Sequence, residues 1–385
     1  MIKSIDIKNF KSIKAKYFPL RNLNVLLGLN GQGKSSFIQT LLLLRQSADS
    51  LRRGALKLNG AEIEIGTTKD ALYQYCGKNE SLSFDLIFDD IPNVSMKFDY
   101  TIGSDVFNLL ASEKNVYGEP KNKLDFNQPL FNNKFQYLNA NRIEPQSIHK
   151  KSYTNVVTLG NIGALGQYTV DYLETRGNEE VEFENLIHPN TVSSQNNQGE
   201  LIRDARLINQ VNLWMREISP EISISTTNVS SDLVKLEYEF DQKTYGKTNP
   251  YKPENVGFGI SYSLHIVVAL LKAKRGDLII IENPESHVHP RGQAELGRLI
   301  SLVAQNNVQL IIETHSDHVL NGIRIGVKEN ISLKDRTILF YFDKVFADVE
   351  QYSRIINIEI DEKGELSEYP KNLLEEWSNQ LLKLL

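Results

Sequence analysis

The stretch Gly28-Leu-Asn-Gly-Gln-Gly-Lys-Ser35 follows an apolar run at residues 23–27 and leads into a second apolar segment. These eight residues fit the pattern G-x-x-x-x-G-K-S/T in the strand–turn–helix context that the pattern requires. Glycines let successive backbone N–H groups converge on an anion, and the start of a helix adds its positive end. Lys34 can then reach the β- and γ-phosphates, and the Ser35 hydroxyl can bind Mg²⁺. The stretch predicts a nucleoside triphosphate site; the alternative, a Gly-rich hairpin turn, is disfavoured by the flanking strand and helix.

The composition is that of an ordinary soluble protein. The chain has 385 residues, of which 41% are apolar and 24% charged, enough for two to three domains or one large α/β domain with an insertion. The net charge of −5 argues against indiscriminate nucleic-acid binding, although lysines crowd the first 16 residues. One cysteine, Cys76, excludes an internal disulfide and a multi-cysteine zinc site. No apolar run reaches 18 residues and no signal peptide opens the chain, so we expect a cytoplasmic protein with no membrane partner.

Hydrophobic periodicity predicts strands at both ends of the chain. Residues 1–27 read as three strands, and the alternation at 82–88 and 236–240 indicates half-buried antiparallel strands. The uninterrupted apolar runs at 278–281 and 308–312 are typical of parallel strands buried on both faces. A strand at 338–342 then leads into a hairpin-like stretch. There is no sustained heptad pattern, so a long coiled-coil arm is not expected.

Helices and loops complete the predicted order. We expect a buried helix after Lys34, helices within 163–217, and an amphipathic helix around Leu296 to Val303. A terminal amphipathic helix is predicted from four apolar residues, Leu373, Leu374, Trp377 and Leu381. Loops are expected where Asn, Ser, Thr, Gly and Lys are dense, at 112–133, 189–200, 224–232 and 242–254.

Three further segments carry chemistry. The strand at 278–281 ends in Glu282, and a P-loop enzyme needs such an acid to hold Mg²⁺ opposite the P-loop hydroxyl. The next apolar strand ends in Glu313-Thr-His315, where a hydroxyl and an imidazole can sense a γ-phosphate. Val256-Gly-Phe-Gly-Ile-Ser261 precedes an apolar helix and can form another anion cradle. The last signal is weak alone, since Gly-x-Gly turns are common.

Together these elements resemble the ATP-binding-cassette class of P-loop ATPases, and more closely the heads of SMC, RecF and OLD-type proteins. The opening Ile5-Asp-Ile-Lys-Asn-Phe10-Lys-Ser is similar to that group's N-terminal lobe. Glu282-Asn-Pro-Glu-Ser-His-Val-His-Pro290 and Glu313-Thr-His-Ser-Asp-His-Val-Leu-Asn-Gly322 closely resemble a bacterial AAA-type ATPase subgroup that ends in a short C-terminal domain of uncharacterised function. Residues 1–75 and 253–385 are covered well, 137–145 also fits, and the middle is covered loosely.

The resemblance implies a fold and a division into segments. The fold would be α/β, an ABC-type P-loop ATPase head with a mixed sheet, an antiparallel β lobe and an inserted α+β region. Residues 1–80 would form the N-terminal lobe with the P-loop, and 81–250 the insertion. Residues 251–345 would form the C-terminal lobe, and 346–385 the small final domain.

The resemblance also implies roles for single residues. ATP phosphates would be bound by the loop residues Asn30, Gly31, Gln32, Gly33, Lys34, Ser35 and Ser36. Ser35 and Glu282 would hold Mg²⁺, and His315 would be the switch histidine. Residues 286–289 would meet a partner subunit. A signature that reaches the γ-phosphate bound to a second subunit would consist of Gly257, Gly259 and Ser261.

One position departs from the wider cassette pattern. The catalytic glutamate normally follows the magnesium acid directly, and here that place holds Asn283. An amide cannot take a proton from water, and losing a general base costs roughly 10²–10⁴ in rate. Either Glu285 replaces the missing base, or hydrolysis is slow and the ATP state is long-lived.

Other motifs are weaker. Asn122-Lys-Leu-Asp125 matches a guanine-reading motif, but no D-x-x-G lies between it and the P-loop, so we interpret the match as chance. Glu282, Glu285, His287 and His289 could suggest a zinc site, although Pro284 and Pro290 make this a loop and favour the nucleotide-interface interpretation. Three further histidines are expected to be packing or surface residues: His149, His188 and His265. Arg142 is either a trans-acting arginine or part of an internal salt bridge.

The sequence thus predicts an ATPase that acts as a conformational switch. It would form a homodimer or higher oligomer around two ATP molecules and control a separate effector. By resemblance, that effector would be a nuclease, in bacterial anti-phage defence or genome maintenance. The alternatives are a RecF-type clamp that binds DNA directly and a pseudo-ATPase scaffold that binds ATP structurally.

Overall fold

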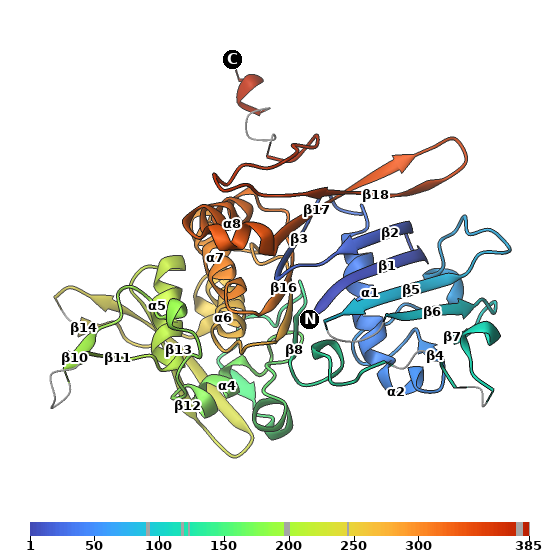
Figure 1. The fold of residues 1–385 in the computed structure, drawn as a ribbon. Coiled ribbons are helices and arrows are strands. Elements are labelled where there is room, and N and C mark those ends of the chain that lie inside the picture. Colours follow the sequence, from blue (N-terminus) through green and yellow to red (C-terminus); the bar gives the residue numbers. More distant parts are fainter. Residues whose placement is uncertain are drawn as a thin grey trace. The chain divides into compact units, whose positions relative to one another are not determined.

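The computed structural model describes residues 1–89, 93–116, 119–121, 124–195, 201–244, 246–374 and 380–384. The chain divides into two compact units. The first comprises Met1–Asn132, Asp335–Glu359 and Leu366–Leu385, and the second Asn133–Lys334 and Ile360–Glu365. These units do not coincide with the four predicted segments, because the predicted insertion at 81–250 is divided between them. Figure 1 colours the elements in chain order.

An antiparallel sheet forms much of the first unit. Its strand order is β2–β1–β5–β6–β7–β4, and every neighbouring pair in it is antiparallel. The strands are β1 (Ile2–Phe10), β2 (Ile13–Pro19), β4 (Ala55–Lys57), β5 (Leu82–Phe88), β6 (Val94–Asp99) and β7 (Val106–Leu109). The short helices α2 (Ala48–Leu51) and α3 (Thr68–Ala71) lie between strands in the chain. The predicted antiparallel strand at 82–88 is confirmed.

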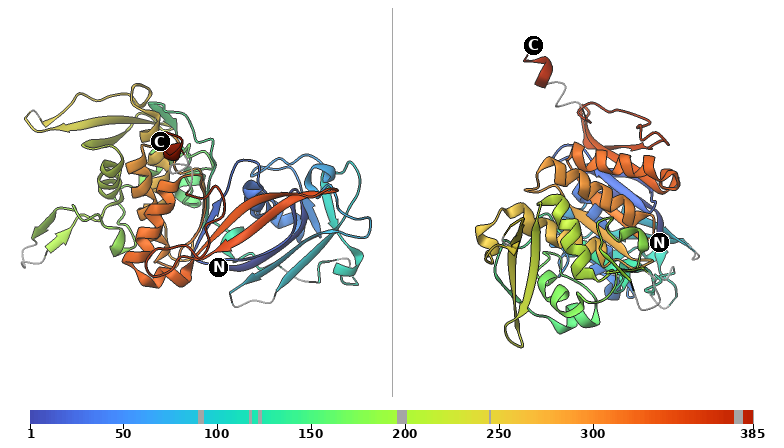
Figure 2. Two further views of the ribbon diagram at one scale, coloured as in Figure 1. Left: turned by 90° about the horizontal axis from the view of Figure 1, so that it is seen from above. Right: turned by 90° about the vertical axis from the view of Figure 1, so that its left-hand side faces the viewer.

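A second layer of the first unit carries the P-loop. In it, β3 (Leu23–Leu27) pairs in parallel with β17 (Thr337–Phe346), which forms an antiparallel hairpin with β18 (Gln351–Ile358). This long hairpin passes beside β2, as Figure 2 shows. Helix α1 (Lys34–Gln46) follows β3, and its apolar side chains are buried as predicted. Phe18 packs against Phe37 and Phe340, with ring centroids 4.6 and 5.3 Å apart, and so joins the sheet to α1 and β17.

The core of the second unit is a parallel group of strands. β15 (Leu278–Glu282) pairs with β16 (Gln309–Glu313) on one side and with β8 (Phe135–Leu138) on the other. Helices α6 (Phe258–Leu271), α7 (Pro290–Ala304) and α8 (Asp317–Glu329) pack in this unit. A Cβ atom on Gly297 of α7 would lie 2.2 Å from the Val319 carbonyl oxygen of α8. Close approach of these two helices therefore requires glycine at that position.

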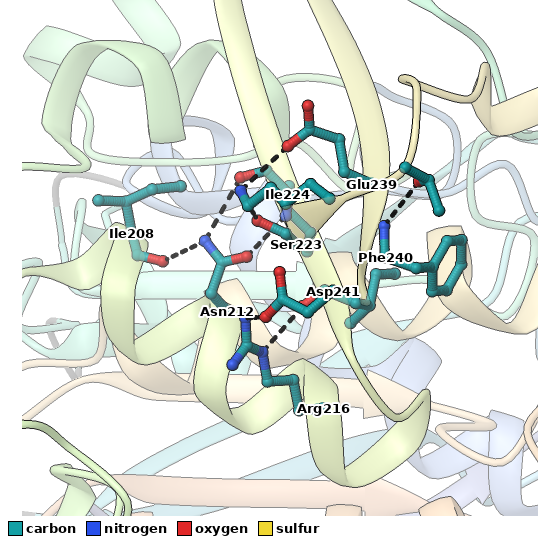
Figure 3. Close-up of polar contacts among 11 residues, drawn as sticks. Ile208, Asn212, Arg216, Ser223, Ile224, Glu239, Phe240 and Asp241 are labelled. Carbon is teal, nitrogen blue, oxygen red and sulfur yellow. Dashed lines mark hydrogen bonds and ion pairs between the residues drawn. The ribbon is translucent and has the colours of Figure 1, made fainter. Parts of the chain in front are cut away.

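A smaller sheet and two helices lie beside this core. β12 (Ile222–Asn228) and β9 (Ile148–Lys150) both pair with β13 (Leu233–Gln242), which also pairs with β14 (Gly246–Lys247). Further elements are a π-helix at Thr154–Thr158, α4 (Thr169–Arg176), α5 (Leu207–Ile218), β10 (Ser193–Gln195), β11 (Leu201–Arg203) and short 3-10 helices at Glu184–Leu186, Pro253–Asn255 and Ile331–Arg336. Figure 3 shows the polar contacts between α5 and this sheet. Asn212 accepts a bond from the Ile224 N–H at 2.6 Å, and Arg216 pairs with Asp241 at 2.6 Å.

Several predictions about irregular segments are wrong. Short strands interrupt two of the predicted loops, since β10 lies within 189–200 and β14 within 242–254. Residues 224–228 are strand rather than loop, because Ile222 to Asn228 pair with β13 along their whole length. Leu373 and Leu374 do not begin a helix, since Asn372 and Leu374 have positive φ angles of 72° and 60°, which interrupt helical backbone. Trp377 of the same prediction lies outside the described residues.

None of the described helices is long and apolar enough to cross a membrane.

Candidate functional site

The P-loop in the first unit has the backbone that its glycines allow. Gly28, Gly31 and Gly33 have φ angles of 128°, 76° and 109°, a region that other residues rarely enter. A Cβ atom on Gly28 would also lie 2.2 Å from the carbonyl oxygen of Phe342 in β17. The loop therefore turns tightly against β17 before α1 begins at Lys34.

Lys34 and Ser35 stand at the first turn of α1. The Lys34 side chain is buried, with the residue 3% exposed, and its Nζ atom donates to the carbonyl oxygens of Gly28 and Leu29 at 2.8 and 3.0 Å. Ser35 is exposed, as are Asn30 and Gly31. A buried ammonium below an exposed loop and hydroxyl is an arrangement that suits a phosphate chain with its cation.

Two serines that were not predicted as site residues, Ser12 and Ser353, support the P-loop through hydrogen bonds. The Ser353 hydroxyl on β18 donates to the Gln32 carbonyl oxygen at 2.7 Å and lies 2.8 Å from the Ser12 hydroxyl. Ser12 in turn lies 3.4 Å from the Ser36 hydroxyl, and Ser36 is buried. The contacts between Ser353 and the loop join residues more than 300 positions apart, so no local pattern could have identified them.

Glu282 ends β15 in the second unit, as predicted. Its Oε1 accepts a bond from the Tyr137 hydroxyl at 3.0 Å, and its Oε2 accepts one from the Ala140 N–H at 3.4 Å. Burial raises the pKa of this carboxyl group, while the Tyr137 bond opposes the rise. A nearby divalent cation would favour the charged form, so the residue fits the predicted role of magnesium acid.

Arg142 organises the turn that follows Glu282. Its guanidinium is buried, with the residue 3% exposed, and donates to the carbonyl oxygens of Glu282 at 2.8 Å and Asn283 at 2.7 Å. Desolvation lowers its pKa to about 10. Arg142 is thus an internal residue that binds carbonyl groups, which corrects both of the predicted alternatives, the trans-acting arginine and the salt bridge.

Asn283 has a local reason to stand where the wider class has a glutamate. Its φ angle is 45°, in the left-handed region that asparagine tolerates better than most residues. Its N–H donates to the Glu313 carbonyl at 2.8 Å, which ties the turn after β15 to the end of β16.

Glu285 holds the segment that carries His315. Its carboxylate accepts bonds from the Thr314 hydroxyl at 2.6 Å and from the His315 N–H at 2.8 Å. Ser316 then caps α8 by accepting from the N–H groups of His318 and Val319, both at 3.1 Å. His315 itself is exposed, on a segment fixed from both sides.

Of the three signature residues, Gly257 is exposed, Gly259 is partly exposed and Ser261 is buried. Gly257 caps α6 and is exposed, and Phe258 is 50% exposed. A Cβ atom on Gly259 would lie 2.2 Å from the His287 carbonyl oxygen. Ser261 is 4% exposed, and its hydroxyl lies 3.0 Å from that of Tyr238. The burial of Ser261 corrects the expectation that its side chain reaches a nucleotide on another subunit.

The remaining histidines have other partners. The His287 ring packs on Tyr262 with centroids 5.1 Å apart, and His289 caps α7 by accepting from the Arg291 N–H. Within the described residues, no three His, Cys, Asp or Glu side chains form a group that could hold a metal. The other three histidines contact neighbours inside the unit: His149 with Gln146, His188 with Glu217 and His265 with Thr169.

The guanine-reading match is described only in part. Asn122 and Lys123 of the guanine-reading match lie outside the described residues, while Asp125 accepts bonds from Asn127 and Gln128 nearby.

The predicted nucleotide-site residues belong to two different units of the chain. The P-loop residues 30–36 belong to the first unit; Glu282, Glu285, His315 and the signature belong to the second.

Solved structures share the fold. The SMC head bound to the C-terminal winged-helix domain of ScpA has a TM-score of 0.53 at 13% identity, covering 93% of this chain and 98% of that one. An SMC head with an extended coiled coil, bound to the C-terminal domain of ScpA from Pyrococcus furiosus, has a TM-score of 0.52 at 13% identity. That likeness covers 100% of this chain and 99% of the other. That structure includes an extended coiled coil, whereas the longest described helix of this chain, α7, has 15 residues.

Family models match nearly the whole chain, while no curated protein matches it in sequence. Residues 334–384 match a family described as a protein of unknown function (DUF3696). Residues 1–320 match the AAA ATPase domain model. The chain therefore belongs to the AAA ATPase domain family and has the fold of an SMC-type P-loop ATPase head.

Proposed function

We propose that this protein is a cytoplasmic, ATP-driven conformational switch, which binds and slowly hydrolyses ATP and closes as a homodimer around it. The observation that carries the proposal is the P-loop itself. Its glycines have the required positive φ angles, and Lys34 and Ser35 stand at the start of α1. Such a loop at a helix start is suited to a phosphate chain.

Each residue of the proposed nucleotide site has its own role. Lys34 and the loop N–H groups bind phosphate oxygens, and Ser35 and Glu282 hold Mg²⁺, which neutralises charge on the phosphates. Tyr137 and the Ala140 N–H orient the Glu282 carboxylate, since both donate to it. Arg142 keeps the turn after Glu282 in one conformation through its two carbonyl bonds.

Hydrolysis is proposed to be slow. Asn283 cannot act as a base, and both carboxylate oxygens of Glu285 already accept bonds from Thr314 and His315. Because Thr314 and His315 engage both of its oxygens, we propose that Glu285 serves mainly to position His315. If a general base is missing, a typical turnover of about 10 per second falls to about 0.1 per second or less.

The exposed start of α6 supports dimerisation. Gly257 has no side chain with which to cap the helix, so its first N–H groups and positive end can receive an anion. Phe258 is half exposed beside it, an apolar side chain that a second subunit would cover. We propose that this end of α6 contacts ATP bound to the P-loop of the partner, in a two-fold dimer.

The effector is proposed from resemblance. The SMC heads that share this fold were solved with ScpA bound, which supports a protein partner here. In the AAA-type subgroup that this chain resembles, a nuclease effector in anti-phage defence or genome maintenance is the expected setting.

Two other functions have narrower support. A RecF-type DNA clamp would need a free basic surface, yet Lys3, Lys14 and Lys16 contact Asp89, Glu350 and the Ile355 carbonyl at 2.8 to 3.0 Å. A pseudo-ATPase scaffold is favoured only by Asn283. DNA-stimulated, salt-sensitive turnover would identify the clamp, and the absence of single-turnover hydrolysis would identify the scaffold.

Calorimetric titration with Mg-ATP tests nucleotide binding. Lys34→Ala is expected to weaken binding by about 10- to 100-fold, since a charge-assisted bond contributes about 1.5–3 kcal/mol. Lys11→Ala is the matched control, because the Lys11 Nζ atom bonds to Gln39 of α1 at 2.7 Å. Equal affinity of Lys34→Ala and the wild type would overturn the assignment.

A further inference from the structure

A polar cavity lies in the second unit, at the end of α6 away from the signature residues. Its volume is about 430 Å³, within the range of small-molecule sites. The lining includes residues at the starts of β8 and β15, the π-helix segment and the C-terminal end of α6. Cations outnumber carboxylates in the lining, which holds Glu182 and Asp277 against Lys134, Arg176, Lys272, Lys274 and Arg275. Of these cations, Arg176 also forms an ion pair with Glu179 at 2.7 Å.

Within the part of the chain that the structure describes, neither carboxylate of the lining forms an ion pair with its cations, although the charge of Asp277 acts on Lys272 at longer range. Glu182 accepts a bond from the backbone N–H of Arg275 at 3.1 Å, and Asp277 accepts one from the backbone N–H of Lys274 at 2.8 Å. Among the described residues, the Lys274 and Arg275 side chains form no ion pair, and both residues are exposed. The cavity therefore presents positive charge that an anion could satisfy.

Lys272 adds a partly desolvated ammonium group. Its Nζ atom donates to the Gly160 carbonyl at 3.0 Å and lies 5.5 Å from the centroid of the Tyr172 ring. Burial lowers its pKa to about 8, the shift expected of a cation that lacks a full counter-charge. Burial also raises the pKa of Asp277, while the bond from the Lys274 N–H and the charge of Lys272 oppose the rise.

Part of the lining has an unusual backbone conformation. Thr154–Thr158 is a π-helix, a rare element found mostly at functional sites. Arg176 fixes it by donating to the carbonyl oxygens of Val156 and Val157 at 3.1 and 2.9 Å. The π-helix and the cations of residues 272–275 thus border one cavity.

We propose that this cavity binds a small phosphate-bearing ligand. Phosphate oxygens suit the excess of lysine and arginine, and the volume admits a small phosphorylated metabolite.

The cavity is also connected to the proposed nucleotide interface. Lys272 caps the C-terminal end of α6, whereas Gly257 caps its N-terminal end. This helix of 14 residues is about 21 Å long, and β15 likewise runs from the cavity at Asp277 to Glu282. Occupancy of the cavity shifts the position of α6 and so changes ATP turnover; this part rests on the proposed function.

Binding is tested with inorganic pyrophosphate and the Lys34→Ala protein, so that the result does not depend on the P-loop. Titration calorimetry should show one site, and Lys274→Glu with Arg275→Glu should weaken it by about tenfold or more. Lys328→Glu, an exposed lysine on α8, is the control and should bind like the parent. No binding, or equal binding by the double variant, would overturn the site.

The coupling is tested separately with the wild-type P-loop. Pyrophosphate is added to protein saturated with Mg-ATP, and turnover is compared with that of the Lys274→Glu/Arg275→Glu protein. A change in turnover confined to the protein with an intact cavity supports the coupling. Binding to the Lys34→Ala protein without any such change would overturn the coupling while leaving the site and the ATPase proposal standing.

Discussion

The Cα atom of Gly259 stands so close to His287 that a Cβ atom at position 259 would lie 2.2 Å from the His287 carbonyl oxygen. The contact joins the first turn of α6 to the loop after β15, which follows Glu282. It fixes the exposed start of α6 relative to the acid that is proposed to hold Mg²⁺.

Gly259→Ala should therefore separate these two segments. We expect it to reduce the free energy of unfolding by about 1–3 kcal/mol, because the obstructing atom is backbone and cannot rotate away. Gly257→Ala is the matched control, since nothing lies within 4 Å of its added Cβ, and it should cost less than about 1 kcal/mol. Urea unfolding measures both; equal losses would show that the contact does not constrain α6.

Glu285 is expected to act through the segment that it holds. Glu285→Gln keeps an acceptor for the His315 N–H, so steady-state turnover should change less than about tenfold. Glu285→Ala removes both bonds, to Thr314 and to His315, and should lower turnover further. A loss of about 10²–10⁴ in Glu285→Gln would instead identify Glu285 as the general base.

His265 should make the fold sensitive to acid. Burial lowers its pKa to about 3, against 6.5 for an exposed histidine, so the unfolded chain takes up the proton first as the pH falls. The free energy of unfolding should therefore fall by about 1.5 kcal/mol between pH 6.5 and pH 5 from this group alone. That part of the stability is present above pH 6.5 and is lost as the pH falls toward 3.

Urea unfolding at pH 7, 6 and 5 measures this loss. His265→Gln cannot take up a proton, so its stability should depend less on pH over this range. His318→Gln, at an exposed position on α8, serves as the control and should follow the wild type. Parallel pH profiles for all three proteins would contradict the prediction.

Local patterns in the sequence predicted the parts of the site that depend on neighbouring residues. The P-loop glycines, Lys34 and the apolar strand before them lie within a dozen positions, and hydrophobic runs identified β15 and β16. The same locality explains why Glu282 was placed correctly at a strand end.

Contacts between distant residues were not predictable in this way. Whether Ser261 faces outward depends on Tyr238, which lies on a strand of the neighbouring sheet. The role of Arg142 depends on carbonyl groups about 140 positions later, and that of Ser353 on a loop at the other end of the chain. Segment 224–228 is polar enough to suggest a loop, yet its pairing with β13 makes it a strand.

Sedimentation velocity with and without Mg-ATP tests the central claim most directly. The wild type should shift from monomer toward dimer when Mg-ATP is added, and Lys34→Ala should not. Gly257→Arg should also abolish the shift, since Gly257 is exposed and the substitution leaves the core intact, whereas an arginine at buried Ser261 would disrupt the fold. An oligomer that forms without nucleotide, or a Gly257→Arg protein that still dimerises with Mg-ATP, would contradict the account.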